Sequence, residues 1–396
     1  MAIHERTLTR PPTAPTARPD APAPTGSPGD AAPRRPALRA FGPNWYATVM
    51  GTAIVASAGT ALPVDVPGLR GACTVVWAVS AVLLVAVLAA RAGHWRHHRD
   101  QARAHLLDPA VAPFLGCLPM ALLSVGGATM VAGTPVVGER AALVVDVVLY
   151  SAGTVLGLAV AVAVPFLMVT RHRLEPGSAA PAWLLPLVPP LVSAALGPLL
   201  ISRLPAGQGR EALLLGCYAM FGLTLLATLA VLPLVFARLL HHGPLPLALT
   251  PTLFLVLGPL GQSTTAVNQL ADVAPGAIGA PYATGLGALA VLYGVPVMGF
   301  ALLWLALSTA LTVRALRAGM GFAMTWWGFT FPLGTCVTGA AGLARHTGLH
   351  AFGWLAEALF VCLLAAWAVA GTRTVRGLLG GTLLGASARP AAVRTA

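Results

Sequence analysis

Two acidic side chains, Asp146 and Glu357, lie inside long apolar runs of the sequence. Each falls within about two turns of the start of its run, where the positive end of a helix dipole favours a carboxylate. An ionisable residue inside a membrane helix is a functional candidate by default, and both acids are candidates for proton coupling in a carrier. The alternative is a carboxylate that the dipole stabilises or that snorkels to the membrane surface.

The sequence otherwise lacks the residue patterns of known catalytic sites. No two carboxylates face each other within an apolar run, and no HExxH, GxSxG or P-loop pattern occurs. The five cysteines lie singly inside apolar runs, so we expect neither a disulfide framework nor a metal site. We therefore expect a protein that is not an enzyme and that carries no metal and no cofactor.

The only dense polar cluster is HWRHHRDQARAH, from His94 to His105. Its histidines lack the cysteine or carboxylate partners of a familiar zinc signature, and we interpret it as a basic segment at the membrane surface. An integral membrane enzyme acting on lipid or quinone is the alternative of a different class. Such an enzyme would need clustered polar side chains at the membrane surface, and this segment is the only place in the sequence that provides them.

Neutral polar residues and prolines gather in every second apolar run. A proline inside a helix frees carbonyl groups and bends the axis, which lipid tolerates where protein or water satisfies the freed groups. We therefore predict that these runs line a path whose neutral dipoles stabilise an anion without trapping it. The alternative is that small residues and prolines serve close helix packing. The pore-lining candidates are Gly51, Thr52, Ser124, Ser193, Gln262, Ser263 and Thr335, and the helix-kink candidates are Pro119, Pro190, Pro259 and Pro332.

Composition indicates that these residues sit in a membrane protein. Only 9% of the 396 residues are charged and 57% are apolar, whereas soluble domains carry about 25% charged residues. About 20 apolar residues cross the hydrocarbon core as a helix, and lipid excludes open strands because the backbone must satisfy its own hydrogen bonds. The sequence predicts an all-α integral membrane protein with ten transmembrane helices, near residues 43–62, 71–91, 109–132, 141–170, 181–203, 211–240, 250–271, 280–313, 322–345 and 350–371.

The odd-numbered runs recur at a regular interval. They begin near residues 41, 108, 181, 250 and 321, a spacing of about 70 residues that corresponds to one helical hairpin. Five hairpins of similar length predict a quasi-fivefold arrangement around a central pore, with the odd-numbered helices inside and the plainer even-numbered helices outside.

The arginines predict the orientation. The 24 basic residues are all Arg and lie at the ends of runs or in the tails, so the net charge of +12 forms no patch and no nucleic-acid partner is expected. The positive-inside rule then places both termini in the cytoplasm of a multi-pass cell-membrane protein. Arg203 and Arg345, on the outer side, either draw anions to the pore mouth or complement helix C-termini. The few Arg on that outer side are Arg70, Arg140, Arg203, Arg210 and Arg345.

Two tails flank the membrane domain. Residues 1–40 are rich in Pro, Ala and Arg without a hydrophobic period, which predicts a disordered cytoplasmic tail. Residues 373–396 are expected to form a short basic cytoplasmic tail. The ten-helix domain is thus predicted to occupy residues 41–372.

Four segments resemble the tellurite-resistance/dicarboxylate transporter family, which includes tellurite-resistance proteins, malate permeases, sulfite exporters and plant slow anion channels. The resemblance spans residues 41–372, and the WWxxTFP element is its most specific part. The segments are FGPNWYATVMGTAIVASAG (41–59), PLVPPLVSAALGPLLI (186–201), LGPLGQSTTA (257–266) and TWWGFTFPLG (325–334).

The resemblance implies a pore of odd-numbered helices, a homotrimer, and transport of small anions across the lipid bilayer. It implies C4-dicarboxylates such as malate as substrate, with sulfite- or tellurite-type oxyanions as the alternative. It also implies that a phenylalanine of the ninth helix closes the pore, and the position within WWxxTFP assigns that gate to Phe331 rather than Phe329. A proton-coupled carrier remains the alternative mechanism.

Overall fold

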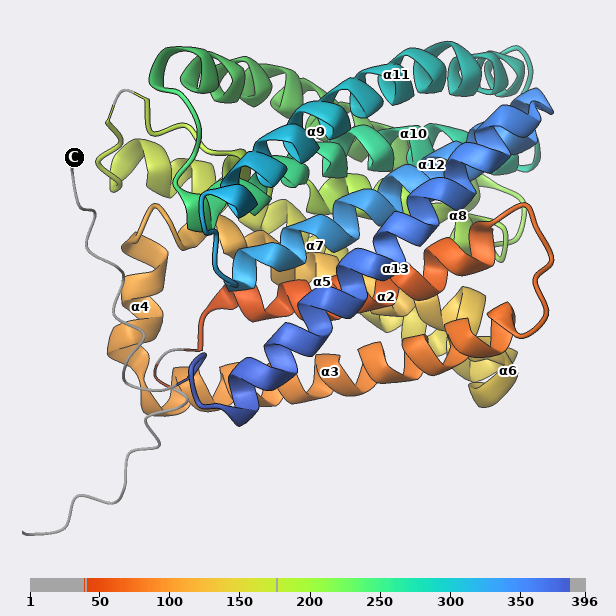
Figure 1. Ribbon diagram of the computed structural model, residues 1–396. Coiled ribbons are helices and arrows are strands. Elements are labelled where there is room, and N and C mark those ends of the chain that lie inside the picture. Colours follow the sequence, from red (N-terminus) through yellow and green to blue (C-terminus); the bar gives the residue numbers. More distant parts are fainter. Residues whose placement is uncertain (1–38, 40, 176, 385–396) are drawn as a thin grey trace, which may run out of the picture. The chain divides into compact units, whose positions relative to one another are not determined.

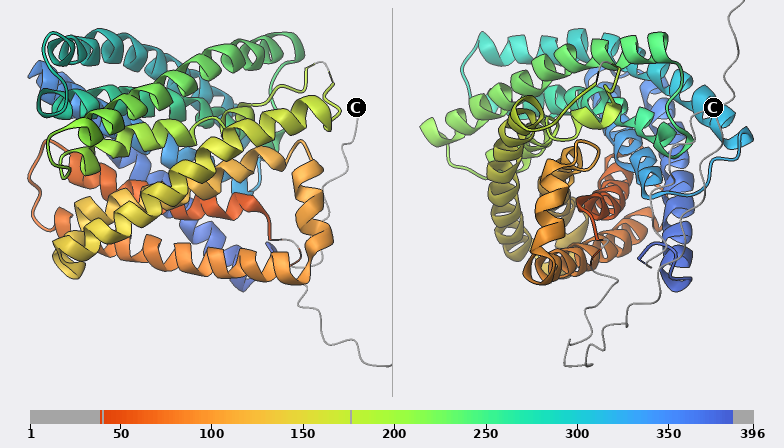
Figure 2. Two further views of the ribbon diagram at one scale, coloured as in Figure 1. Left: turned by 180° about the vertical axis from the view of Figure 1, so that it is seen from behind. Right: turned by 90° about the vertical axis from the view of Figure 1, so that its left-hand side faces the viewer.

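The computed structural model describes residues 39, 41–175 and 177–384, all within one compact unit. Across these residues the chain forms helices and turns and contains no strand, which confirms the all-α prediction. The helices run roughly across the view of Figure 1 and are seen nearer to end-on in the right panel of Figure 2. The predicted tail over 1–40 lies outside the described residues apart from Arg39, as do residues 385–396.

Five inner helices form the core of this unit. Their contacts run from α2 to α5, α8, α10 and α12 and then back to α2, so that the five helices close a ring. Most of their residues are buried. The inner helices are α2 (Tyr46–Ala61), α5 (Cys117–Ala128), α8 (Pro189–Ile201), α10 (Leu257–Val273) and α12 (Thr330–Thr347).

Five longer helices surround the ring, and each packs on the inner helix that precedes it in the chain. They form the second helix of each hairpin that the 70-residue spacing predicts. They are α3 (Leu69–His97), α7 (Glu139–Thr170), α9 (Gln208–His242), α11 (Tyr282–Arg317) and α13 (His350–Leu379). The short helix α4 (Arg99–Leu107) lies across their direction at one end (Figure 1).

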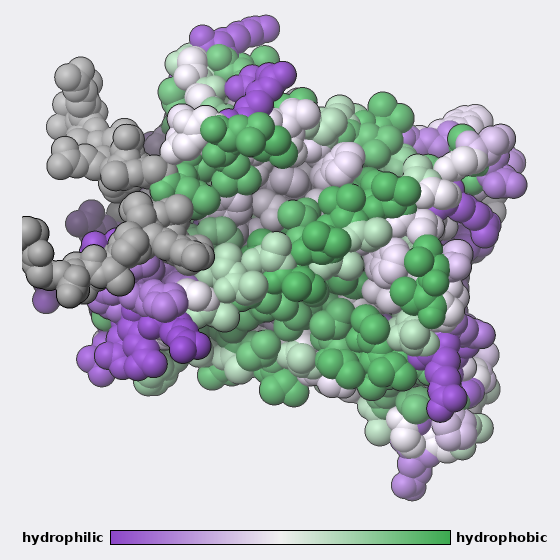
Figure 3. All heavy atoms as spheres, turned by 90° about the horizontal axis from the view of Figure 1, so that it is seen from below, coloured by the Kyte–Doolittle hydropathy of each residue, from purple (hydrophilic) through white to green (hydrophobic). Residues whose placement is uncertain are grey.

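The apolar surface of the outer helices is suited to lipid. In the apolar windows of these helices only 22% to 28% of the residues are buried, against 72% for the inner segment Ala112–Val137. Figure 3 shows a broad hydrophobic band between hydrophilic ends on one face. Within the described chain six helices are long and apolar enough to cross a membrane. Each of the ten predicted runs is helical, while ten membrane crossings and the quasi-fivefold symmetry remain predictions.

The four prolines expected to kink helices occupy a different position from the mid-helix sites predicted. Pro119, Pro190, Pro259 and Pro332 lie in the first turn of α5, α8, α10 and α12. In the interior of an α-helix a proline ring clashes with the carbonyl group four residues earlier. Here that clash is avoided because the turn before each proline is not α-helical. A 3₁₀ segment precedes every inner helix: η1 (Pro43–Trp45), η2 (Ala112–Gly116), η4 (Pro181–Leu184), η5 (Leu247–Val256) and η7 (Met324–Phe329).

Two further segments differ from a plain helical hairpin. After α5 the chain forms a π-helical segment, η3 (Thr129–Gly133), and a single turn, α6 (Thr134–Val137). At the other end of the chain α13 continues to Leu379, seven residues beyond residue 372, the predicted end of the ten-helix domain. Arg373 and Arg376 favour this extension because cations stabilise the C-terminal end of a helix dipole.

Candidate functional site

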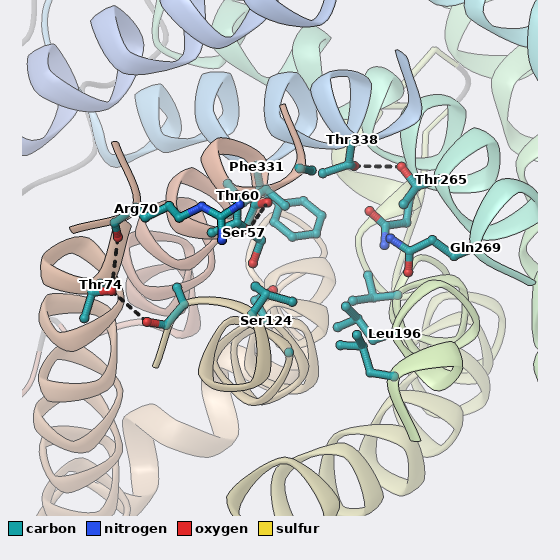
Figure 4. A pocket seen from close by; sticks show the side chains of 18 of the residues that line it. Ser57, Thr60, Arg70, Thr74, Ser124, Leu196, Thr265, Gln269, Phe331 and Thr338 are labelled. Carbon is teal, nitrogen blue, oxygen red and sulfur yellow. Dashed lines mark hydrogen bonds between the residues drawn. The ribbon is translucent and has the colours of Figure 1, made fainter. Parts of the chain in front are cut away.

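A cavity of about 430 Å³ is bounded by all five inner helices (Figure 4). Hydroxyl and amide side chains supply most of its polar wall. Among the lining residues that the structure describes there is no acid, and Arg70 is the only charged side chain. The polar lining residues are Ser57, Thr60, Thr74, Ser124, Gln262, Thr265, Gln269 and Thr338.

Each inner helix turns one face toward this cavity. On α10 the lining residues are Gln262, Thr265 and Gln269, spaced three and four apart, as the 3.6-residue repeat of a helix requires. The other inner helices follow the same spacing. Their lining residues are Ile54, Ser57, Thr60 and Ala61 on α2, Ser124 and Gly127 on α5, Val192, Leu196 and Leu199 on α8, and Phe331 and Thr338 on α12.

The mouth of the cavity carries the positive charge. Arg70 lies in the first turn of α3, and its side chain extends toward Ser57 and Thr60 of α2 (Figure 4). The Arg70 side chain is exposed and has no acidic partner within the described chain. Thr74, one turn along α3, donates a 2.8 Å hydrogen bond to the carbonyl oxygen of Ala132 in the π-helical segment η3. This bond ties α3 to the cavity wall.

The contact between α10 and α12 provides hydroxyl groups on the opposite side. Thr265 Oγ1 lies 2.7 Å from Thr338 Oγ1 and 3.1 Å from the carbonyl oxygen of Thr335. Gln262 is only 4% exposed, and its Oε1 has no hydrogen-bond partner among the residues described. Its amide group is therefore a free hydrogen-bonding group in the cavity wall.

An aromatic ring lies at the buried part of the wall. Phe331, in the first turn of α12, is 3% exposed and lines the cavity (Figure 4). Phe329 instead packs edge-on against Phe254 and Trp326, with ring centroids 4.8 Å and 5.8 Å away. Of the two rings in the WWxxTFP element, Phe331 is the one that faces the cavity.

Residues 40–375 match the family of voltage-dependent anion channels. The chain belongs to this family. The family resemblance found in the sequence is thereby confirmed, and the family consists of membrane anion channels and transporters rather than enzymes.

Relatives of the chain carry more specific names. Sulfite efflux pumps SSU1 from Arthroderma otae and Trichophyton rubrum are 29% and 28% identical to it over 345 residues, or 86% of this chain and 91% of each pump. An uncharacterized transporter from Methanocaldococcus jannaschii is 24% identical over 346 residues, or 87% of this chain and 95% of that protein.

In this member of the family the predicted pore-lining residues divide into two groups. Ser124 and Gln262 line the cavity. Gly51 instead lies at the contact between α2 and α12. A Cβ atom added to Gly51 would be 2.2 Å from Thr330 Oγ1. Thr335 donates a 2.7 Å hydrogen bond to the carbonyl oxygen of Pro332 on its own helix. Gly51 and Thr335 thus lie outside the lining of this cavity, and their place in a pore stays a prediction.

Three further candidates also lie away from this cavity. Thr52 Oγ1 accepts a 3.1 Å hydrogen bond from Trp367 Nε1 of α13. Ser193 Oγ accepts a 2.9 Å hydrogen bond from Thr154 of α7. Ser263 lines a separate, mostly apolar cavity of about 340 Å³ between α9 and α11. These hydroxyl groups therefore connect helices or face a different space.

Two arginines expected near the mouth are neutralised by acids. Arg203 pairs with Glu139, and Arg345 pairs with Asp272 at 3.3 Å. Arg70, rather than Arg203 or Arg345, is the arginine at the mouth of the cavity. The sequence analysis did not single it out for this position.

The two acids proposed for proton coupling also lie outside the lining of the cavity. Asp146 on α7 is 1% exposed, and both of its carboxylate oxygens lack a hydrogen-bond partner in the described structure. Its Oδ1 is held against Gly126 of α5, 2.7 Å from where a Cβ atom would lie. Glu357 on α13 is half-buried. Asp146 is thus the acid that lies beside an inner helix.

The histidine segment forms a compact cluster where α3 and α4 meet. His94 of α3 stacks on His105 of α4, with centroids 5.3 Å apart and an interplanar angle of 5°. Arg91 donates a 2.7 Å hydrogen bond to the carbonyl oxygen of Phe41. Within the described residues no group of three His, Cys, Asp or Glu side chains is arranged to hold a metal ion.

Sequence reasoning missed several cavity residues besides Arg70. On α10 a usable signal was present, because Thr265 and Gln269 continue the helical face begun by Gln262. Ser57 and Thr60 likewise follow each other by three residues on α2. Thr338 follows the predicted gate Phe331 by seven residues, or two helical turns, on the same face of α12.

Proposed function

We propose that this protein exports sulfite, or a similarly small oxyanion, through the cavity enclosed by the inner helices, with Phe331 as its gate. The observation that carries this proposal is a wall from all five inner helices that contains neutral hydroxyl and amide groups, one Arg and no acid among the described residues. The named function of the sulfite efflux pumps, which align over 91% of their length, supports the substrate.

The chemistry of the wall suits an anion that must both enter and leave. Ser57, Gln262 and Gln269 make no side-chain hydrogen bond within the described chain, so their O–H and N–H groups can donate to an anion without a full charge. They replace part of its hydration shell without trapping the ion. The charge of Arg70 raises the local anion concentration at the mouth. An acid in the wall would repel the same ions.

Phe331 provides the barrier. A buried benzyl group in a narrow neutral passage blocks it sterically and keeps water out. Opening then requires the ring to rotate away from the cavity. Its position in the first turn of α12, directly before Pro332, lets a small movement of that turn displace the ring.

The arginine distribution supports an orientation of the cavity in the membrane. Arg70 begins α3 at the cavity, whereas Arg91 and Arg96 lie near the opposite end of the same helix. By the positive-inside rule the second end faces the cytoplasm, so the cavity opens to the outside of the cell membrane. Ions would pass Phe331 from the cytoplasmic side before they reach the cavity.

The test is anion flux in liposomes that contain the purified full-length protein. Sulfite, nitrate, chloride and malate are compared at equal concentration and fixed pH. We expect sulfite to move fastest, whereas faster malate flux would replace the substrate with the C4-dicarboxylate that the family resemblance also implies. Absence of flux for all four anions, with the protein inserted and folded, would overturn the proposed function.

A further inference from the structure

A second hollow, larger than the cavity, lies outside the ring between α3 and α13. Its volume is about 820 Å³, and its wall is almost entirely apolar. Val79 to Ala90 of α3 form one side, and Trp367 to Leu378 of α13 form the other. The floor consists of residues near the start of α2 together with Trp327 of η7. We call this hollow the α3–α13 groove.

The length of the groove matches one leaflet of a membrane. From Val79 to Ala90 a helix rises about 16 Å, and the hydrocarbon core is about 30 Å thick in total. Both α3 and α13 border the groove with their C-terminal halves, so it occupies the half of the membrane nearest their C-terminal ends. A single acyl chain from the leaflet at that end spans this distance.

The end of the groove is positively charged. Arg376, in the last turn of α13, is part of its wall. Within the described chain no acid pairs with Arg376. Arg373, one turn earlier, lies over the ring of Trp326 at 5.3 Å. Guanidinium groups bind phosphate through charge-assisted hydrogen bonds, and basic residues at this depth attract anionic lipid headgroups.

We propose that the α3–α13 groove binds one anionic phospholipid, with an acyl chain between the two helices and the headgroup phosphate on Arg376. A neutral lipid would fill the same apolar space without the contact to Arg376. A second copy of the chain would be the occupant if the groove were a subunit interface, and the experiment below separates these cases.

The floor of the groove connects the lipid to the gate. Trp327 Nε1 donates a 2.9 Å hydrogen bond to Thr374 of α13, and the carbonyl oxygen of Trp327 accepts a 2.8 Å hydrogen bond from Thr330. Thr330 directly precedes Phe331. The lipid therefore contacts the segment that carries Phe331 from the side opposite the cavity. If the proposed function holds, anion flux should depend on the presence of anionic lipid.

The test measures lipid binding directly, so it does not depend on transport. Native mass spectrometry of the full-length protein counts bound phosphatidylglycerol and phosphatidylcholine after equal exposure to both. Gly371 lines the groove, and a Cβ atom there would meet open space, so Gly371→Leu fills the groove without a clash. Gly299→Leu on α11 is the matched control, because Gly299 is exposed with equally open surroundings but lies outside the groove.

We expect the wild type and Gly299→Leu to retain phosphatidylglycerol in preference to phosphatidylcholine. Gly371→Leu should bind at least about fivefold less phosphatidylglycerol than the wild type. Arg376→Gln should bind phosphatidylglycerol and phosphatidylcholine equally well. Unchanged phosphatidylglycerol binding in Gly371→Leu would overturn the proposal. A change in oligomeric state with unchanged lipid binding would overturn it too, and would assign the groove to a second copy of the chain. Loss of flux alone would bear only on the proposed function.

Discussion

Phe331 combines burial with a position facing the cavity, whereas Phe329, two residues earlier, is held by two other aromatic rings. A helix rotates side chains by about 200° over two residues, so the two rings cannot share one direction. The spacing in the sequence predicts that one ring faces the path and the other packs. The choice of Phe331 came from the family resemblance, and its function as a gate stays a prediction.

Replacing Phe331 tests the gate. Phe331→Ala removes the ring from the passage, and we expect sulfite flux in liposomes to rise about tenfold, equivalent to lowering the barrier by about 1.4 kcal/mol. Phe329→Ala is the matched control, because it deletes the same side chain from a packed position outside the cavity. Equal flux from wild type and Phe331→Ala, with normal insertion, would remove Phe331 from this role.

Replacing Arg70 tests the attraction of anions to the mouth. A unit charge about 8 Å away attracts an anion by about 0.5 kcal/mol even in water, so Arg70→Gln should reduce flux about twofold or more at low ionic strength. The reduction should shrink near 0.15 M salt, where the screening length is about 8 Å. Arg140→Gln, an exposed arginine at the start of α7 outside the cavity lining, serves as control. An effect of Arg70→Gln that does not depend on salt would contradict the electrostatic explanation.

At the scale of elements, the close approach of α10 and α12 builds the hydroxyl side of the cavity. Gly261 permits it, because an added Cβ atom would lie 2.5 Å from the backbone nitrogen of Cys336. A clash with backbone cannot be relieved by a rotamer change, so the helices would have to separate. The bond between Thr265 and Thr338 depends on the same contact.

Substitution of Gly261 should therefore destabilise the protein. We expect Gly261→Ala to cost about 1–3 kcal/mol, as overpacked cores do, and to lower the thermal unfolding temperature in detergent. Gly258→Ala on the same helix is the control, since a Cβ atom at Gly258 meets open space. Similar unfolding temperatures for both variants would show that α10 and α12 tolerate separation.

The α3–α4 contact should weaken in acid. Burial lowers the pKa of His105 below its ordinary value of 6.5, the charges of Arg91 and His94 act in the same direction, and Asp108 opposes them. The folded protein thus binds a proton at His105 less readily than the unfolded chain does. The stability that neutral His105 contributes is therefore fully present above about pH 6.5 and is lost as the pH falls below this value.

His105→Gln should remove part of this dependence. We expect the unfolding temperature of the wild type to fall more steeply between pH 7.5 and 5.5 than that of the variant, in detergent at constant salt. His350→Gln is a control at an exposed histidine on α13. If both variants follow the wild type over this range, protonation of His105 does not govern the contact.

At the scale of the whole molecule, the open question is how flux is driven. Asp146 is buried beside α5 without a hydrogen-bond partner within the described residues, and an unpaired charge in such surroundings is costly. Its neighbour Gly126 adjoins Gly127, which lines the cavity. A change in the packing of α5 would therefore alter the surroundings of Asp146, one of the two acids predicted for proton coupling.

Proton coupling predicts a specific pH response. If the protein is a coupled carrier, sulfite flux should depend steeply on pH, and Asp146→Asn should flatten this profile. Glu357→Gln on α13 is compared in the same assay, and a flattened profile in this variant instead would assign the coupling to Glu357. A wild-type profile in Asp146→Asn would favour a passive channel. The homotrimer implied by the family remains a prediction that native mass spectrometry can check in the same preparation.

The sequence alone determined the helical runs, the hairpin spacing, the membrane environment and the family, because apolar length and periodicity are local properties that lipid enforces one segment at a time. Only the tertiary structure decided which polar groups meet. A serine or threonine hydroxyl is satisfied equally well by a carbonyl of its own helix, as in Thr335, or by a facing helix, as in Thr265. The tertiary structure likewise distinguished Arg70, which lines the cavity, from Arg203, which pairs with an acid 64 residues away in the chain.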